Sequence, residues 1–164
     1  MYDKKALNDI ASYFIKTSEH LAVAESVTSG HLQAALSLVD SASNFFQGGI
    51  TTYNVVQKFR HLHIDLTKAV NCNCVSREIA EAMALNICKL FITQWGIGIT
   101  GYAVPIEEQG IIELFAYYAI AFKGKIVQTG VLHAPNGSKI SSQVFYTNCL
   151  LDYLSLLLKD IEIE

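Results

Sequence analysis

A short apolar run that ends in a cluster of hydroxyl residues constrains the fold of this chain more than any other stretch. Leu21 to Ala24 has the pattern of a buried strand, and Ser26 and two further hydroxyl residues follow before Gly30. Leucine, alanine and valine then recur at helical spacing, which predicts a helix over about residues 30–39. A strand that enters a helix through such a turn is the building unit of an α/β sheet.

The turn after this strand is a candidate site for an anion or a developing oxyanion. The start of a helix offers free backbone N–H groups and the positive end of the helix dipole. Ser26 would stand where an open α/β sheet places its ligand crevice. A purely structural interpretation is that Thr28 or Ser29 caps the helix. The turn is not a Walker loop, because no Gly-Lys-Ser/Thr follows, nor a dinucleotide turn, because its only glycine is Gly30.

Helix and strand patterns continue along the rest of the chain. We expect helices over residues 3–18, 55–61, 77–91 and after 138, strands over 50–53 and 95–100, a hairpin of strands over 112–122 and 125–134, and an irregular segment over 64–74. This order predicts one domain over residues 1–164. Its fold class is α/β, with three α/β/α layers and a mixed sheet whose antiparallel part is the hairpin.

Composition argues against several classes of partner. The chain is 51% hydrophobic and 16% charged, as globular domains are. Its net charge of −3 and the lack of a basic run argue against nucleic acid. The longest apolar stretch, residues 114–122, is too short to cross a bilayer, and the N-terminus lacks a signal-peptide pattern. We therefore expect a cytoplasmic protein that binds neither nucleic acid nor a membrane.

The cysteines and histidines do not predict a metal site. One residue separates Cys72 from Cys74, but no second cysteine pair accompanies them. His61 and His63 have the same spacing and could form a metal-binding pair, yet acidic residues near them are few. We therefore expect no metal and no other cofactor.

Four blocks of the chain, in order, resemble one known family. They are Ala24-Glu-Ser-Val-Thr-Ser-Gly30, Gly49-Ile-Thr-Thr-Tyr-Asn54 with Lys58, Val75-Ser-Arg-Glu-Ile-Ala-Glu-Ala-Met-Ala84, and Gly98-Ile-Thr-Gly101. They resemble the CinA C-terminal family, whose motifs include Ala-Glu-Ser-Cys-Thr-Gly-Gly and a Tyr-Ser/Asn-(x)-Lys segment, and whose active members are nicotinamide-nucleotide amidases. The resemblance extends from about residue 21 to about residue 101; beyond it, only the strand and helix pattern matches.

The resemblance implies a catalytic set of Ser26, Tyr53 and Lys58 that needs no metal. Hydrolysis of a carboxamide requires a nucleophile, a base and donors for the oxyanion. No histidine lies in the matching blocks, so Lys58 would be the base if burial or a nearby positive charge lowers its pKa. Tyr53 would relay the proton or hold the lysine neutral. The candidate oxyanion donors are the backbone N–H groups around Thr28 to Gly30.

The remaining candidates belong to the substrate site. The residues that we expect to bind substrate are Glu25, Thr28, Ser29, Gly30, Asn54, Thr100 and Gly101. Structural interpretations stand beside these roles. Tyr53 could be a half-buried packing residue, Lys58 a solvated lysine, and Glu25 either an orienting acid or an exposed residue at the end of a strand.

Three departures from the family pattern affect substrate binding. Ser29 replaces a glycine, and the loop over residues 102–110, rich in Gly and Pro in the family, is bulkier here and carries Glu107 and Glu108. The family's last helix often carries arginines, whereas residues 139–158 contain only Lys139 as a cation. A phosphate would find few partners, and the two glutamates would repel it.

Two functions follow from these observations. The first is an amidohydrolase that deamidates nicotinamide mononucleotide or a related carboxamide, with Ser26 as nucleophile and Lys58 as base. The alternative is a non-catalytic or repurposed relative that acts as a binding or assembly domain. The resemblance also implies self-association, and we expect a homo-oligomer with an interface near residues 112–134.

Overall fold

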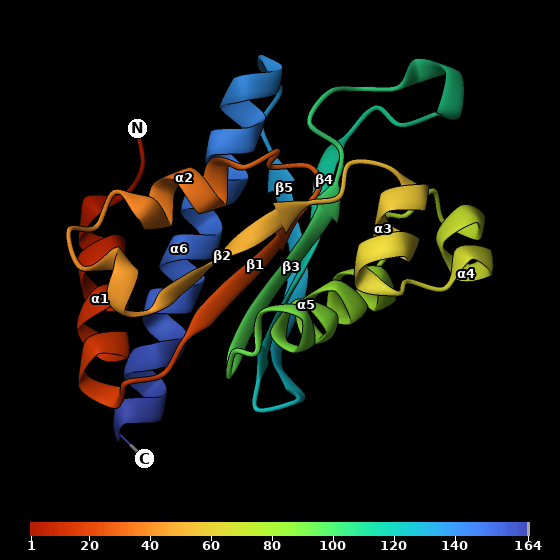
Figure 1. Cartoon of the computed structure of the whole chain (residues 1–164). Coiled ribbons are helices and arrows are strands. Elements are labelled where there is room, and N and C mark those ends of the chain that lie inside the picture. The colour runs from red at the N-terminus through yellow and green to blue at the C-terminus, as the bar shows by residue number, and fades with distance from the viewer. Residues whose placement is uncertain (164) are drawn as a thin grey trace.

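The computed structural model describes residues 1–163, in which one mixed sheet lies between two layers of helices (Figure 1). The elements in chain order are α1 (Lys4–Thr17), β1 (Leu21–Glu25), α2 (His31–Ser37), η1 (Ala42–Asn44), β2 (Phe46–Thr51), α3 (Val55–Leu62), α4 (Leu66–Asn71), α5 (Arg77–Phe91), β3 (Trp95–Gly101), η2 (Glu107–Gln109), β4 (Leu114–Phe122), β5 (Lys125–Ala134) and α6 (Lys139–Ile163). The predicted three-layer α/β fold is confirmed.

The five strands have the order β2-β1-β3-β4-β5. β1 pairs in parallel with both β2 and β3, and β4 and β5 form the expected antiparallel hairpin beside β3. The carboxyl ends of β1, β2 and β3 therefore meet at one edge of the sheet. The turn before α2, the start of α3 and the loop after β3 all begin there, so this edge is where an α/β sheet places a ligand site.

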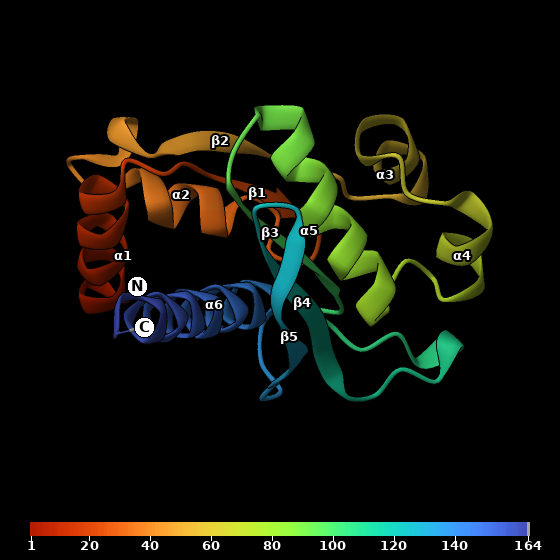
Figure 2. The ribbon, with the colours of Figure 1, turned by 90° about the horizontal axis from the view of Figure 1, so that it is seen from below.

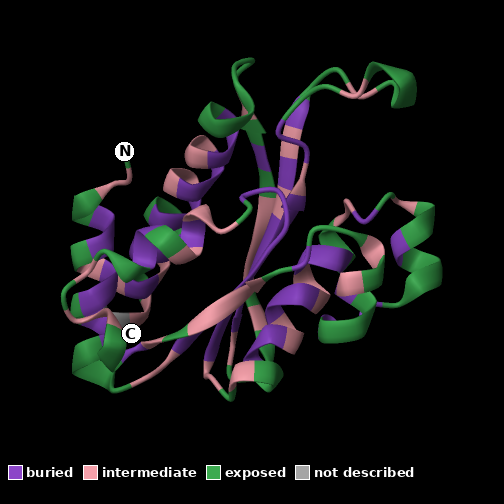
Figure 3. Cartoon of the chain, turned by 45° about the horizontal axis from the view of Figure 1, so that its top comes forward, coloured by how far each residue is buried: buried purple, intermediate pink, exposed green. Residues whose placement is uncertain are grey.

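The two faces of the sheet differ in side-chain size. Along β3, Trp95, Ile97 and Ile99 face the core shared with α1, α2 and α6. On the other face, glycine and alanine predominate in β1, β3 and β4, and α5 lies against them. Figure 2 shows α6 and α5 on opposite sides of the sheet. Buried residues follow the sheet and the inner faces of the helices (Figure 3).

Two elements differ from the sequence-based prediction. β2 covers Phe46–Thr51 instead of residues 50–53, because its backbone pairs with β1 from Leu21 to Glu25 despite the two glycines within it. Tyr53 therefore lies beyond the strand. Part of the segment expected to be irregular forms α4, which the Asp65 side chain caps by accepting a hydrogen bond from the Lys68 N–H. Only Ala69 of this helix is buried, so its apolar periodicity is weak.

Within residues 1–163, no helix combines the length and the apolarity that crossing a bilayer requires.

Candidate active site

A cavity of about 490 Å³ opens at the edge of the sheet where β1, β2 and β3 end. Ser26 comes directly after β1, Asn54 and Lys58 come from the start of α3, and Thr100 and Gly101 end β3. These five residues line the cavity, together with Tyr53 and Lys139 near the start of α6. The topology thus gathers residues from across the sequence around one space, as a parallel sheet edge does in α/β proteins.

Ser26 and Lys58 form a direct contact in this cavity. The Lys58 ammonium donates to the Ser26 Oγ at 2.8 Å and to the Thr52 carbonyl at 2.7 Å. Lys58 is only 1% exposed, although it belongs to an otherwise largely exposed short helix. The interpretation of Lys58 as a solvated lysine is therefore wrong. The predicted contact between the serine and the lysine is present in the structure.

Burial determines the acidity of Lys58. Removal from water lowers the pKa of Lys58 from 10.5 to about 8, and the nearby Cys74 thiol opposes this shift. Among the described residues no carboxylate forms an ion pair with Lys58, so nothing compensates the charge fully. A lysine with such a pKa is partly neutral near pH 8 and can accept a proton from a serine hydroxyl.

Tyr53 shares the cavity but not the serine–lysine contact. Its side chain is 59% exposed, and its hydroxyl accepts a hydrogen bond from the Lys139 ammonium at 3.1 Å. No hydrogen bond in the described part of the chain joins Tyr53 to Ser26 or to Lys58. Tyr53 is therefore neither half-buried nor positioned in this structure as a direct relay between them.

Glu25 is part of the scaffold of the Ser26 turn and does not line the cavity. The carboxylate is fully buried and accepts hydrogen bonds from the N–H groups of Gly30, Leu32 and Gln33 at 2.8 to 3.1 Å. It therefore occupies the start of α2, where the sequence predicted a site for an external anion. Side chains at alternate positions of a strand face opposite sides of a sheet, which explains why Glu25 reaches α2 and Ser26 does not.

The helix cap expected from Thr28 or Ser29 is absent, because Glu25 takes that role. The Thr28 hydroxyl is buried without a hydrogen-bond partner among the described residues. Ser29, which replaces the family's glycine, has a positive φ of 50°, a conformation that costs a non-glycine residue some strain. Thr28, Ser29 and Gly30 do not line the cavity.

The N–H groups that are free in this turn differ from those predicted as oxyanion donors. The Ser29 N–H donates to the Ser26 carbonyl at 3.2 Å, and the Gly30 N–H donates to Glu25. The N–H groups of Val27 and Thr28, in contrast, make no hydrogen bond to any described residue. Of the predicted donors only that of Thr28 is free, and Val27 adds a second donor next to the nucleophile candidate.

Cys74 and its neighbours form a wall of the cavity that the sequence analysis missed. Thr100 donates to the Cys74 carbonyl at 2.7 Å, and the Asn73 amide donates to the Tyr102 hydroxyl and to Gln109. This segment fell in the stretch expected to be irregular. The only available signal was its position directly before the block that begins at Val75.

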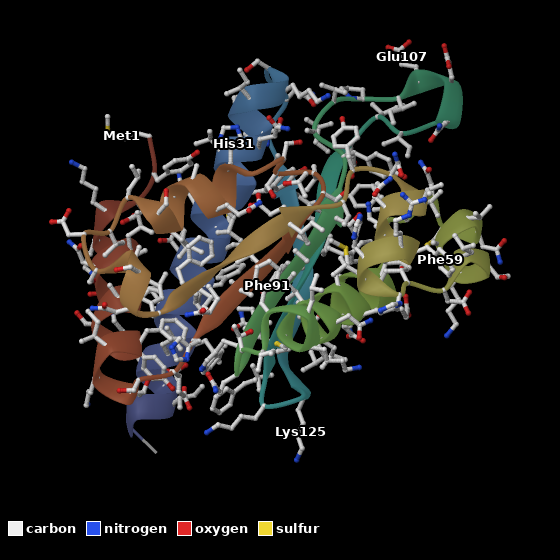
Figure 4. The ribbon with its side chains drawn as sticks, in the orientation of Figure 1. Met1, His31, Phe59, Phe91, Glu107 and Lys125 are labelled. Carbon is white, nitrogen blue, oxygen red and sulfur yellow. The ribbon has the colours of Figure 1, made fainter. Side chains whose placement is uncertain are left out.

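The acidic pair of the loop after β3 lies away from the cavity. Glu107 and Glu108 belong to η2 and are exposed, and neither lines the cavity. Figure 4 shows Glu107 at the outer tip of this loop. Neither glutamate therefore faces the interior of the cavity in this structure. The loop instead contributes Val104, Ile106 and the Gln109 amide to the cavity.

Metal-ligating side chains do not gather in this structure. Within the residues described, His, Cys, Asp and Glu form no group of three or more that could hold a metal ion. The side chains with reactive groups that line the cavity include those of Ser26, Tyr53, Lys58 and Cys74.

Comparisons with known proteins agree with the fold. The family model of the CinA C-terminal domain matches residues 3–147. A CinA-like protein of Picosynechococcus is 42% identical over 90 residues, which are 55% of this chain and 22% of that protein. A putative competence-damage inducible protein of Lacticaseibacillus casei is 31% identical over 134 residues, 79% of this chain and 32% of that protein. The matches thus span only about a fifth to a third of these curated relatives.

A solved structure shows the same architecture over nearly the whole chain. It is the crystal structure of a CinA-superfamily protein from Klebsiella pneumoniae, with a TM-score of 0.88 and 24% sequence identity. The match covers 95% of this chain and 97% of that one.

Proposed function

The chain belongs to the CinA C-terminal domain family, and from that premise we propose that it is an amidohydrolase that deamidates nicotinamide mononucleotide or a related carboxamide. The observation that carries the proposal is the buried Lys58, whose ammonium lies 2.8 Å from the Ser26 Oγ. Burial of a lysine without a carboxylate partner is costly for a fold. A role as a base explains why the fold tolerates this cost, because a base must be neutral before it accepts a proton and burial makes Lys58 partly neutral near pH 8.

The reaction proceeds in two halves. Neutral Lys58 accepts the hydroxyl proton while the Ser26 Oγ bonds to the amide carbon. The C–N bond then breaks, and the Lys58 ammonium returns the proton to the leaving nitrogen, which departs as ammonia. In the second half, Lys58 deprotonates a water that attacks the resulting ester. The bond to Ser26 breaks, the carboxylic acid leaves, and the serine recovers its proton.

The cavity offers few cationic partners for a phosphate group. Among the described residues, no carboxylate side chain lines the cavity, and apart from Lys58 the only cationic lining residue is Lys139. The phosphate of nicotinamide mononucleotide would therefore meet one lysine, held by Tyr53, in place of an arginine fork. We propose that nicotinamide riboside, which lacks the phosphate, is used at least as well as the mononucleotide.

The free thiols favour a location of the protein in a reducing compartment. All four cysteines are unpaired. Disulfides are typical of oxidising compartments and rare in the cytosol, so we propose a cytoplasmic location. We further propose that the partner is a small carboxamide, and that the protein binds neither nucleic acid nor a membrane.

The alternative function is a binding or assembly domain without catalysis. The observation that favours it is the position of Tyr53, whose hydroxyl contacts Lys139 and not the serine–lysine pair. A family member whose tyrosine takes no part in catalysis could still bind a carboxamide in the same cavity.

Ammonia release from the purified chain tests the two functions. Nicotinamide mononucleotide, nicotinamide riboside and nicotinamide are the substrates, with Ser26→Ala and Lys58→Met as variants. Matched controls are Ser37→Ala, an exposed serine of α2, and Lys68→Met, an exposed lysine of α4. We expect turnover that each site variant reduces by about a thousandfold and that the controls retain. A folded wild type that releases no ammonia would support the binding domain instead.

A further inference from the structure

A cluster of uncharged polar side chains lines the cavity apart from the serine–lysine pair. The Asn73 amide donates to the Gln109 Oε1 at 3.0 Å and to the Tyr102 hydroxyl at 3.3 Å, and all three residues line the cavity. Asn73 lies between α4 and α5, whereas Tyr102 and Gln109 belong to the segment between β3 and β4. These three side chains, which we call the amide cluster, therefore join two separate segments of the cavity wall.

The amide cluster continues the wall that begins at the reacting end of the cavity. The parallel register of β1 and β3 brings Ser26 to the level of Thr100, and the Thr100 hydroxyl donates to the Cys74 carbonyl at 2.7 Å. Asn73 directly precedes Cys74 in the chain. Because Cys74 is buried and Asn73 is exposed, the cavity is closed near the serine and open at the amide cluster. A carboxamide that reacts at Ser26 has room to extend its other end toward the cluster.

The amide cluster has unused donors and acceptors. The Asn73 Oδ1 and the Gln109 Nε2 have no hydrogen-bond partner among the described residues, and the Tyr102 hydroxyl accepts from Asn73 and keeps its own proton to donate. These groups are uncharged, and together they offer both donors and acceptors. A sugar hydroxyl, which also donates and accepts, matches such a set, whereas an ionised phosphate mainly accepts and is bound most strongly by cations.

We propose that the amide cluster is a sugar subsite, which binds the ribose hydroxyls of nicotinamide riboside while the carboxamide lies at Ser26. This inference rests on the proposed function and specifies its substrate class, a carboxamide on a ring that carries a ribosyl group. The ribose and the carboxamide are attached to different atoms of the pyridine ring, so the ribose points away from the reacting carbon. The cluster therefore determines specificity and takes no part in the chemical step.

Two substitutions each remove one amide from the cluster. Asn73→Gly suits the positive φ of 49° at this position, so the backbone is kept while the amide is lost. Gln109→Ala shortens an exposed side chain of η2. Asn71→Ala and Glu108→Ala are matched controls, because both residues are exposed near the cluster and do not line the cavity. Circular dichroism identifies the folded variants, and either cluster variant suffices for the test.

Two pyridinium ligands isolate the contribution of the hydroxyl groups. Nicotinamide riboside and nicotinamide methylated at its ring nitrogen share the ring, the carboxamide and the positive charge, but the methyl compound has no hydroxyl. Each variant is combined with Ser26→Ala, so that no ligand is turned over, and isothermal titration calorimetry measures both affinities. We expect the Ser26→Ala protein to bind the riboside about tenfold more tightly than the methyl compound. Either cluster variant should reduce this preference by about threefold or more, and the controls should retain it.

Turnover of nicotinamide riboside gives an independent readout in the chain with Ser26 intact. Loss of either amide should raise KM by about threefold or more and change kcat by less than about twofold, because the cluster does not touch the reacting atoms. If ammonia is never released but the preference for the riboside depends on the cluster, the sugar subsite stands and deamidation fails. Deamidation with a preference that survives both cluster variants would overturn the subsite alone. Equal affinity for the two ligands, or binding of neither, would also overturn it.

Discussion

At the scale of the residue, the burial of Lys58 dominates the energetics of the site. A pKa lowered from 10.5 to about 8 corresponds to about 3 kcal/mol of destabilisation when the lysine is charged. Between these two values the unfolded chain binds more protons than the folded one, so the free energy of unfolding rises with pH in this window. Below pH 8 both states are protonated and the full cost remains.

Lys58→Met should therefore stabilise the fold at neutral pH. The gain is partly offset because the Thr52 carbonyl loses its donor, which costs about 1–3 kcal/mol. The advantage of the variant over wild type should be about 2 kcal/mol smaller at pH 10 than at pH 7. Urea unfolding at both pH values measures this difference, with Lys68→Met as the exposed control. An advantage that does not change with pH would mean that Lys58 keeps an ordinary pKa in the folded state.

Sequence alone could predict the identity of the site residues better than their environment. Ser26 and Lys58 were found through motif blocks, and the structure brings them together. The environment of Tyr53 was not predictable, because its partner Lys139 is 86 positions away in the chain. Glu25 was ambiguous for a related reason: only the packing of α2 decides whether a residue at the end of a strand is exposed or caps a helix.

At the scale of the element, α2 depends on a charge supplied from β1. Glu25→Gln should lower the free energy of unfolding by about 1–3 kcal/mol, because an amide cannot accept three N–H groups as a carboxylate does. The exposed Glu108→Gln is the matched control and should stay within about 0.5 kcal/mol of wild type. Chemical denaturation measures both variants. Equal stability of the two would show that Glu25 does not support the start of α2.

The packing of α5 on β3 depends on a strand face without side chains. A Cβ at Gly98 would lie 2.3 Å from the Ala80 carbonyl and 2.6 Å from the Ala84 nitrogen. Gly98→Ala should therefore destabilise the fold by about 2–4 kcal/mol as α5 is displaced. A Cβ at Gly137 would meet mainly the Ser141 hydroxyl, a side-chain atom that can rotate away, so Gly137→Ala should have a much smaller effect. Thermal unfolding compares the two, and a Gly98→Ala variant as stable as Gly137→Ala would contradict this close approach.

The elements that sequence could not place are those without a strong pattern. Most helices and the β4–β5 hairpin were predictable from their apolar periodicity. α4 was not predictable, because a helix with one buried alanine shows no apolar periodicity. The start of β2 was not predictable either, because its glycines are not typical of a strand. Pairing with β1, a contact distant in sequence, creates that strand.

At the scale of the whole molecule, the sheet topology assembles the site. Three parallel strands end at one edge, and α6 begins at the same edge after the hairpin. Gln143 therefore reaches a turn 116 positions earlier in the chain, and Lys139 reaches Tyr53, 86 positions earlier. This arrangement was predictable as a fold class, since alternating helices and strands favour it. The contacts of α6 were not predictable, because the matching blocks end near residue 101.

Self-association remains a prediction at this scale. β5 lies at the edge of the sheet and carries Val127 and Val131, which are 40% and 43% exposed. Sedimentation velocity at micromolar concentration should show a homo-oligomer, and Val127→Lys with Val131→Lys should shift it toward the monomer. The double substitution of Lys125 and His133 by alanine is a control on the same strand. A wild-type monomer would contradict the prediction.

The activation of Ser26 by Lys58 is tested most directly by the rate at which an electrophile modifies Ser26. The protein is incubated with pyridine-3-sulfonyl fluoride between pH 6 and pH 10, and intact mass with peptide mapping follows the adduct. We predict a single adduct on Ser26, with a rate that rises to a plateau and is half-maximal near pH 8, the pKa of Lys58. We also predict a rate at least a hundredfold lower in Lys58→Met. A Ser26 that stays unmodified, or that reacts equally fast without Lys58, would contradict this activation.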